Sequence, residues 1–342
     1  MMFKKFLSVS FVSLVVLGLL SFSAVMAQSE IGTPENPIQV YFVPSVEAQV
    51  IVSGGEVMAA ALNEATGLTF EVAVPASYAA TVEAMCASPD NSIGFIPAAG
   101  YVIANNRCGV EVGAAAVRRG WPVYWAAYIV ARDSDIYTFA DLEGRTWGYP
   151  DAASTSGFIV PSAEMGAAGI TPGEGIQTGG HNQTVQAVYD GEVDFGTTFY
   201  SPPVMPGGAW GIGDLPEPYD LSIDESYVGE DGNLYVGDIQ ILDARQNLRE
   251  TAPDVIDQVR ILRISAPIPN DTMSFGPDFP EETRQEIIDA LLAFSETEEW
   301  AQSIGSEDFY GWSSIVPIED SAFDPVRLQF EILGMTEDDI FS

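Results

Sequence analysis

The sequence predicts an α/β protein of two lobes. Short apolar strands alternate with helices over residues 37–104 and again over 139–196, which is the pattern of β-α-β units and mainly parallel sheets. Two β-rich stretches, 110–117 and 123–131, lie between the two series. A chain of 342 residues, 47% of them hydrophobic, is long enough for two domains of ordinary size. Two such lobes predict a ligand site at their interface.

The first series begins with a strand and alternates regularly. Ser77 is a suitable N-cap for its second helix, and Gly67 ends its first. The predicted strands are 37–43, 68–74 and 93–96, and the predicted helices are 46–64, 77–85 and 98–104.

The second series repeats this order after the β-rich stretches. Its predicted elements are a short helix at 139–144, a strand at 145–149, a helix over 158–165, an amphipathic helix from His181 to Gly191 and a strand at 193–196. Further along, we predict a strand at 259–264, a rigid crossing segment at 266–271 and helices at 281–294, 298–304 and 320–333.

Residues 201–238 are rich in proline, glycine and acidic residues, which predicts a long loop with a hairpin at 230–233. The acidic residues around Asp224 and Glu230 do not have the spacing of a helix-loop-helix calcium site. No metal site and no cofactor are predicted.

The chain starts with the features of a secretory leader. Lys4 and Lys5 precede the apolar run 11–20, and Val25 and Ala27 are small residues suited to the cleavage site. We therefore expect residues 1–27 to be a signal peptide and the remainder to be exported, in the periplasm or outside the cell. No later stretch has the roughly 18 apolar residues that a membrane span needs.

The chain is strongly acidic after the leader. Lys4 and Lys5 are its only lysines, so 11 arginines face 49 acidic residues and the net charge is near −38. Nucleic acids and anionic membrane surfaces would be repelled by such a surface, which argues against both as partners. A small anion is not excluded, because its binding depends on local dipoles.

Cys86 and Cys108 are the only cysteines. An isolated pair in an exported chain is most simply a disulfide, worth about 3 kcal/mol in the loop-entropy model. The alternative is two buried free thiols.

Three consecutive hydroxyl residues, Ser154, Thr155 and Ser156, follow a short strand and precede a predicted helix. Unpaired backbone N–H groups and the positive end of the helix dipole converge at such a first turn, so an anion can be held there by hydroxyls and amides. The alternative is that these residues only cap the helix.

Five stretches of the sequence resemble motifs of the phosphonate-binding family of ABC-importer receptors, which bind phosphate, phosphite and phosphonates. They occur in family order over roughly residues 38–300, which makes chance agreement improbable. They are 77–85 with 94–96, 124–130, 141–145 with 154–161, 181–194 and 268–271.

The resemblance implies a two-lobed receptor of the second periplasmic-binding-protein class, with lobes joined by two crossing strands. The first lobe would comprise 28–131 and 265–342, and the second 132–264. The implied partners are a small phosphorus oxyanion and an ABC transporter permease, and the implied state is a monomer. The ligand residues carried over from the family are Tyr78, Tyr124, Ser154, Thr155, Ser156, His181 and Asp271.

Asp271 suggests how the ligand would be selected. A carboxylate repels an anion unless a proton lies between them, and phosphite, phosphonate and phosphate monoanions carry a P–OH that can donate, whereas sulfate at neutral pH cannot. The alternative is that Asp271 is a turn residue.

One position departs from the family pattern. Members that bind amino-alkyl phosphonates carry a glutamate about twenty positions after the histidine, where this chain has Ser201. We therefore expect a small ligand without an amine, such as phosphite, phosphate or methylphosphonate, with Ser201 as a further candidate contact.

Two other readings remain at this point. The same receptor could bind another oxyanion, such as a sulfonate or carboxylate, since a fold does not fix a ligand. A secreted phosphoester hydrolase would have to pair His181, the only histidine, with a hydroxyl of the 154–156 turn. We favour a binding protein over an enzyme, because the sequence contains neither a CxxC pair nor a GxSxG elbow.

Overall fold

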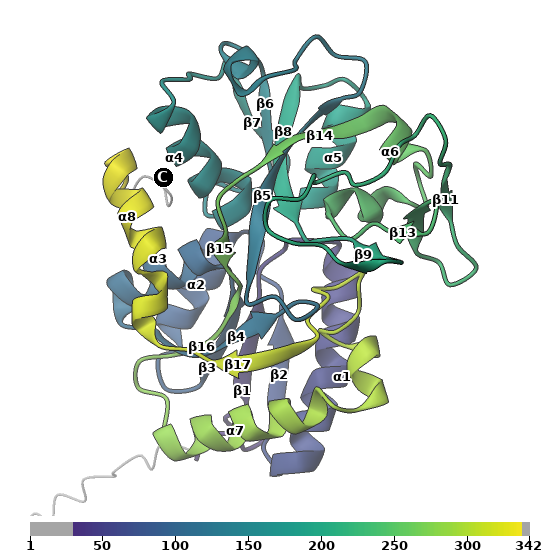
Figure 1. Cartoon of the computed structure of the whole chain (residues 1–342). Coiled ribbons are helices and arrows are strands. Elements are labelled where there is room, and N and C mark those ends of the chain that lie inside the picture. Colours follow the sequence, from purple (N-terminus) through teal and green to yellow (C-terminus); the bar gives the residue numbers. More distant parts are fainter. Residues whose placement is uncertain (1–29, 337–342) are drawn as a thin grey trace, which may run out of the picture.

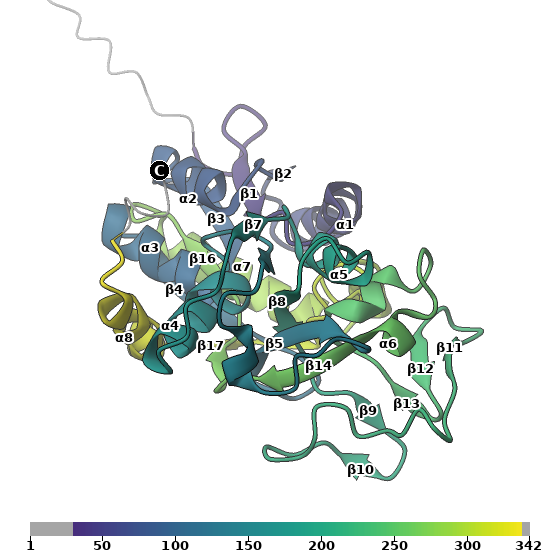
Figure 2. The same cartoon turned by 90° about the horizontal axis from the view of Figure 1, so that it is seen from above.

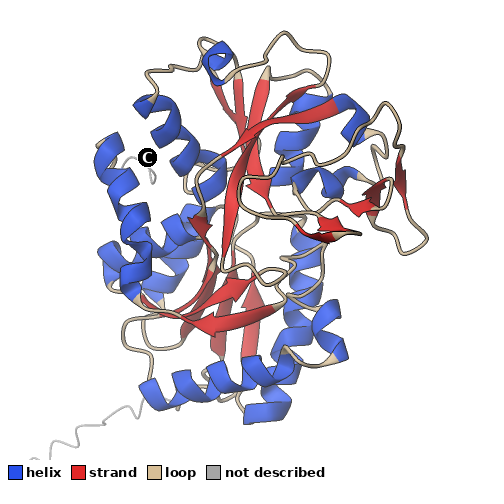
Figure 3. Ribbon diagram, viewed as in Figure 1, coloured by secondary structure: helices blue, strands red, loops and turns tan. Residues whose placement is uncertain are grey.

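The computed structural model describes residues 30–336. The predicted signal peptide, residues 1–27, lies outside the described residues. Figure 1 shows two lobes, each built on a β-sheet, and Figure 3 shows helices flanking both sheets. No helix within 30–336 has both the length and the apolar character needed to cross a membrane.

The first sheet has the strand order β17-β4-β16-β3-β1-β2. Its strands are β1 (Ile38–Phe42), β2 (Phe70–Ala73), β3 (Ser92–Ile96), β4 (Glu111–Val117), β16 (Thr272–Phe275) and β17 (Ser314–Pro317). The helices of this lobe are α1 (Ala48–Thr66), α2 (Tyr78–Ala87), α3 (Ala98–Cys108), α7 (Glu281–Phe294) and α8 (Asp324–Leu333), with 3₁₀ turns at Glu298–Gln302 and Asp320–Phe323.

The second sheet has the strand order β14-β5-β8-β6-β7, and β15 also pairs with β5. Its strands are β5 (Val123–Ala131), β6 (Trp147–Tyr149), β7 (Gly175–Gln177), β8 (Phe195–Tyr200), β14 (Val259–Ile264) and β15 (Ile268–Pro269). Its helical segments are η1 (Phe139–Leu142), η2 (Thr155–Ile159), α4 (Val160–Ala167), α5 (His181–Tyr189), η3 (Ala244–Leu248) and α6 (Val255–Gln258).

The α/β fold and the two lobes agree with the sequence prediction, but both sheets are mixed rather than mainly parallel. Strands joined by helices, such as β1 with β2 and β6 with β7, pair in parallel. β16 is antiparallel to β3 and β4, and β5 is antiparallel to β8 and β14. These strands belong to segments that run between the lobes and enter a sheet without a helical crossover, so the β-α-β rule does not apply to them.

Two extended segments connect the lobes side by side. One runs from β4 into β5, and the other from β14 through β15 into β16. Tyr124 of β5 is paired with Ile268 of β15, which brings the two crossings together. β5 pairs with strands of the second sheet along its length, while the predicted boundary between the lobes lies at its end, after residue 131. The lobe boundaries themselves stay predictions.

The acidic stretch predicted as a loop forms four strands of a small antiparallel sheet, whose fifth strand follows directly after it. The order is β10-β9-β13-β12-β11, and the predicted hairpin at 230–233 is present as the turn between β11 and β12. Figure 2 shows this sheet to one side of the second lobe, near α6. Its strands are β9 (Val204–Met205), β10 (Gly208–Ala209), β11 (Ser226–Val228), β12 (Leu234–Val236) and β13 (Ile239–Gln240).

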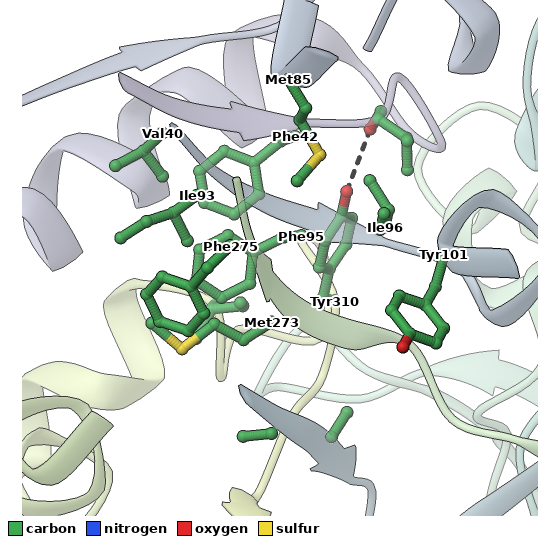
Figure 4. Close-up of a cluster of buried hydrophobic side chains, with 14 of the residues drawn as sticks. Val40, Phe42, Met85, Ile93, Phe95, Ile96, Tyr101, Met273, Phe275 and Tyr310 are labelled. Carbon is green, nitrogen blue, oxygen red and sulfur yellow. Dashed lines mark hydrogen bonds between the residues drawn. The ribbon is translucent and has the colours of Figure 1, made fainter. Parts of the chain in front are cut away.

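The core of the first lobe is aromatic and reaches the side that faces the second lobe. Phe42 of β1 stacks on Phe95 of β3 with ring centroids 4.7 Å apart, and both are fully buried. The Tyr310 hydroxyl donates to the Val43 carbonyl oxygen at 3.0 Å, as Figure 4 shows. Packing therefore fixes the carboxyl ends of β1 and β3, which support one wall of the site.

The structure joins Cys86 and Cys108 by a disulfide, as predicted, with the sulfur atoms 2.02 Å apart. The two cysteines lie at the ends of α2 and α3. The bond therefore ties these neighbouring helices together.

Candidate functional site

A small cavity lies between the two lobes, with a volume of about 60 Å³. Because roughly 10–15 Å³ already admits one water, a cavity of this volume admits a small ligand. A tetrahedral phosphorus oxyanion has five heavy atoms and is thus of the right size.

Seven of the eight candidate residues line this cavity, although they come from distant parts of the chain. They are Tyr78, Tyr124, Ser154, Ser156, His181, Ser201 and Asp271. Thr155 is fully buried next to them, and its hydroxyl oxygen accepts a hydrogen bond from the Ala99 backbone N–H at 2.8 Å. The Thr155 side chain therefore joins the turn to α3 rather than lining the cavity.

The hydroxyl turn forms as expected at the start of a helix. Ser154 is the N-cap, and its side-chain oxygen accepts from the Gly157 backbone N–H at 3.2 Å. Ser154 therefore caps the helix and also lines the cavity. A Cβ on Gly157 would lie 2.2 Å from Pro150 Cγ, so only glycine fits there. The first turn, η2, is a π-helical turn that continues into α4, a widening often found at functional sites.

His181 begins α5 and is a neutral donor or acceptor for the cavity. Burial lowers its pKa to about 3, and the positive charge of Arg118 acts in the same direction. The ring is 4% exposed, and its Nδ1 has no hydrogen-bond partner among the described residues. A neutral imidazole has one donor and one acceptor, so it can give one hydrogen bond to a ligand.

The cavity tyrosines keep their protons at neutral pH. Burial is the main cause that raises the pKa of Tyr78, Tyr124 and Tyr310, and the negative charge of Asp271 raises all three further. Hydrogen bonding with Ser156 acts in the opposite direction on Tyr124. Protonated phenols near an oxyanion are hydrogen-bond donors.

The sequence analysis missed Arg118, which lies on the crossing between β4 and β5 and lines the cavity. Its Nη2 donates to Asp271 Oδ2 at 2.6 Å, and its Nε donates to the Tyr310 carbonyl oxygen at 2.9 Å. The site therefore contains a cation in addition to the hydroxyls and helix amides predicted from the sequence. The adjacent arginines Arg118 and Arg119, among only 11 after the leader, were the signal in the sequence.

The other cavity residues that the sequence analysis missed include Arg119, Glu307 and Gln246. Arg119 and Glu307 form an ion pair. Together with the Arg118–Asp271 pair, this gives the cavity two cations and two carboxylates. Nothing in the spacing of these residues along the chain points to one site.

Several hydrogen bonds join the lobes around the cavity. The Tyr78 backbone N–H donates to Asp151 Oδ2 at 3.4 Å, and the His181 backbone N–H donates to the Ser45 carbonyl oxygen at 3.3 Å. Burial raises the pKa of Asp151. These contacts, together with the one between Thr155 and Ala99, indicate that the structure has its lobes closed.

Comparisons with known proteins agree with this arrangement. The chain matches the family described as ABC transporter, phosphonate, periplasmic substrate-binding protein over residues 40–323. A curated relative, the phosphate-import protein PhnD of Mycolicibacterium smegmatis, is 27% identical over 182 residues, which are 49% of this chain and 56% of that protein. The match thus spans only about half the length of that relative.

Two solved structures have the same fold. A binding protein component of an ABC phosphonate transporter from Pseudomonas aeruginosa has a TM-score of 0.64 at 19% identity, with 87% of each chain covered. PhnD1 of Prochlorococcus marinus, solved with methylphosphonate, has a TM-score of 0.64 at 13% identity, with 87% of this chain and 98% of that chain covered.

Proposed function

Because the chain belongs to the family of periplasmic substrate-binding proteins of phosphonate ABC transporters, we propose that it captures a small phosphorus oxyanion between its lobes and delivers it to a permease. The family is extracytoplasmic and consists of binding components rather than enzymes. The hydrolase alternative is therefore dropped. We further propose that phosphite, phosphate or a small alkylphosphonate is the ligand, and that the leader directs export.

The observation that carries the ligand class is the set of neutral donors around a cavity of about 60 Å³. Tyr78, Tyr124 and His181 are buried and neutral at neutral pH, and Ser156 lies in the first turn of a helix, where backbone N–H groups converge. Hydroxyls, an imidazole and a helix N-terminus suit an oxyanion of small volume.

Asp271 supports a protonated oxyanion. Arg118 bonds Oδ2 of this carboxylate, and within the described residues Oδ1 has no hydrogen-bond partner. A ligand P–OH would donate a hydrogen bond to Oδ1. Sulfate has no proton at neutral pH, so one of its oxygens would instead be repelled by the carboxylate oxygen. Selection against sulfate is thus proposed to rest on Asp271.

Thermal unfolding of residues 28–342 with phosphate, phosphite, methylphosphonate, aminoethylphosphonate, a sulfonate and sulfate tests the proposal. A ligand at one hundred times its dissociation constant adds about 2.7 kcal/mol, a shift of several degrees. We expect shifts with one or more of the first three compounds and none with sulfate. A shift with the sulfonate alone would assign the receptor to another oxyanion, and no shift with any phosphorus compound would refute the proposed ligand class.

A further inference from the structure

Gln246 is one of the polar residues that line the cavity. The residue is 3% exposed, and its Oε1 is buried without a hydrogen-bond partner among the described residues. Its backbone is fully used, because the N–H donates to the Asp243 carbonyl oxygen at 3.0 Å and the carbonyl oxygen accepts from Arg249 N at 3.1 Å. The side-chain amide is thus the part of Gln246 left available for a ligand.

The segment that carries Gln246 is held firmly in place. Arg245, its neighbour in η3, is 1% exposed and bonds both carboxylate oxygens of Asp243 at 2.8 and 2.9 Å. It also donates to the Val259 carbonyl oxygen at 3.0 Å and to the Tyr219 hydroxyl at 3.1 Å. These bonds hold the backbone that carries Gln246 next to the cavity.

The acidic insertion, residues 201–238, has a part in this arrangement. Tyr219 and Glu217 both lie in it, and the Glu217 carboxylate accepts a hydrogen bond from Arg245. No residue between 205 and 238 lines the cavity itself. The insertion thus bonds Arg245, the neighbour of Gln246 in η3.

An amide that is buried without a partner is costly, and a ligand with a complementary group recovers that cost on binding. An amide offers an acceptor oxygen and two N–H donors, and a hydroxyl can pair with either kind of group. A methyl group pairs with neither. A ligand with a hydroxyl near the phosphorus would therefore fit this wall better than a purely alkyl one.

We propose that Gln246 is a specificity-determining residue that hydrogen-bonds a hydroxyl on the carbon tail of a short phosphonate, so that hydroxylated short-chain phosphonates are preferred to methylphosphonate. This inference rests on the proposed function. The small volume of the cavity, about 60 Å³, favours a short tail.

Calorimetric titration of the leaderless protein with hydroxymethylphosphonate and methylphosphonate tests the proposal. We expect the wild type to bind the hydroxylated compound about three- to tenfold more tightly, the worth of one neutral hydrogen bond. In Gln246→Met, which keeps the side-chain length, the ratio should fall to about one while the affinity for methylphosphonate changes by less than about threefold.

Asn247→Leu is the matched control. It removes the next amide along the chain, whose Oδ1 is also buried without a partner but which lines an outer groove instead of the cavity. The ratio should stay at its wild-type value. In Gln246→Glu, the new carboxylate should shift the binding preference towards aminomethylphosphonate. Misfolding would weaken binding of every ligand and could not produce this new preference.

Two results would overturn the role of Gln246. One is equal affinity of the wild type for the hydroxylated and methyl compounds, and the other is an unchanged ratio in Gln246→Met. Both leave the proposed function intact, because phosphonates still bind. Failure of phosphate, phosphite and every phosphonate to bind the wild type would instead refute the proposed function, and with it this inference.

Discussion

Two arginines of this protein, the buried Arg245 and the partly exposed Arg118, stand in contrast. Arg245, in the second lobe, is 1% exposed and has protein partners for all three of its guanidinium nitrogens. Arg118, at the cavity, also has protein partners for its three nitrogens, but within the described residues Oδ1 of its partner Asp271 has no hydrogen-bond partner. Both are arginine–carboxylate contacts. In the first, which we call closed, both Asp243 oxygens are bonded; in the second, which we call open, one Asp271 oxygen is left without a partner. The difference indicates which cluster stabilises the fold and which is available to a ligand.

The electrostatics of the closed cluster support this reading. Burial alone would raise the pKa of Glu217, but the guanidinium groups of Arg245 and Arg132 hold it below its ordinary value. Glu217 thus stays charged inside the second lobe. Removing one partner of such a cluster leaves a buried charge without compensation.

The largest effect is expected from Arg245→Met. Asp243 would lose its cation while remaining buried, and Glu217 would keep only Arg132, which should lower the free energy of unfolding by about 3–5 kcal/mol. Urea unfolding of the ligand-free protein measures this. The control is Arg145→Met, whose partner Asp135 is mostly exposed and whose loss should not be measurable. Equal effects of the two variants would show that the buried Arg245 cluster stabilises the fold no more than an exposed ion pair does.

Asp271→Asn breaks the open pair and should act on binding more than on folding. Without the carboxylate, a protonated phosphorus oxyanion loses a charge-assisted hydrogen bond, worth about 1.5–3 kcal/mol. Sulfate should bind better, because the Arg118 charge is no longer neutralised. Calorimetric titration with phosphite and sulfate gives the ratio of the two affinities. Glu307→Gln, which removes another carboxylate at the same cavity, is the control. A ratio unchanged from the wild type would show that Asp271 does not select the ligand.

His181 is a second open group, and its effect depends on pH. Its pKa is about 3 in the folded protein and near 6.5 when unfolded. The unfolded chain therefore binds a proton between these values while the folded chain does not, so acid destabilises the fold. Relative to His181→Gln, wild-type stability should fall by about 2 kcal/mol between pH 7 and pH 5. Parallel stability curves for the two proteins over this range would contradict the assignment.

The sequence predicted what depends on local pattern. Alternation of strands and helices gave the α/β class, Ser77 was correctly expected to cap α2, and the hydroxyl turn was placed at a helix start. The mixed sheets were missed because β5, β14 and β16 enter by crossing between lobes, which periodicity does not encode. The small sheet over residues 204–240 was missed because its strands are only two or three residues long.

The residues of the site divide in the same way into those that local sequence predicted and those that it did not. Residues in contiguous motifs were found, whereas Arg118 and Gln246 reach the cavity through tertiary packing alone. Gln246 in particular depends on Arg245, whose partners Tyr219, Asp243 and Val259 are spread over about forty residues of the chain. Nothing about an isolated glutamine shows that its amide will be buried without a partner.

The smallest expected effect distinguishes two neighbouring hydroxyls of the 154–156 turn, one already bonded within the protein and one available to a ligand. Thr155 Oγ1 already accepts from the Ala99 N–H across the lobes, while the Ser156 hydroxyl lines the cavity. Ser156→Ala should therefore weaken ligand binding by about 1 kcal/mol or more at unchanged stability. Thr155→Val, which keeps the shape, leaves a buried N–H unpaired in the closed form, so it should favour open lobes and raise the radius of gyration of the ligand-free protein in solution scattering. If instead Thr155→Val weakens binding while the scattering of the ligand-free protein stays the same, the Thr155 hydroxyl contacts the ligand, as the family resemblance implies, and the division within the turn is wrong.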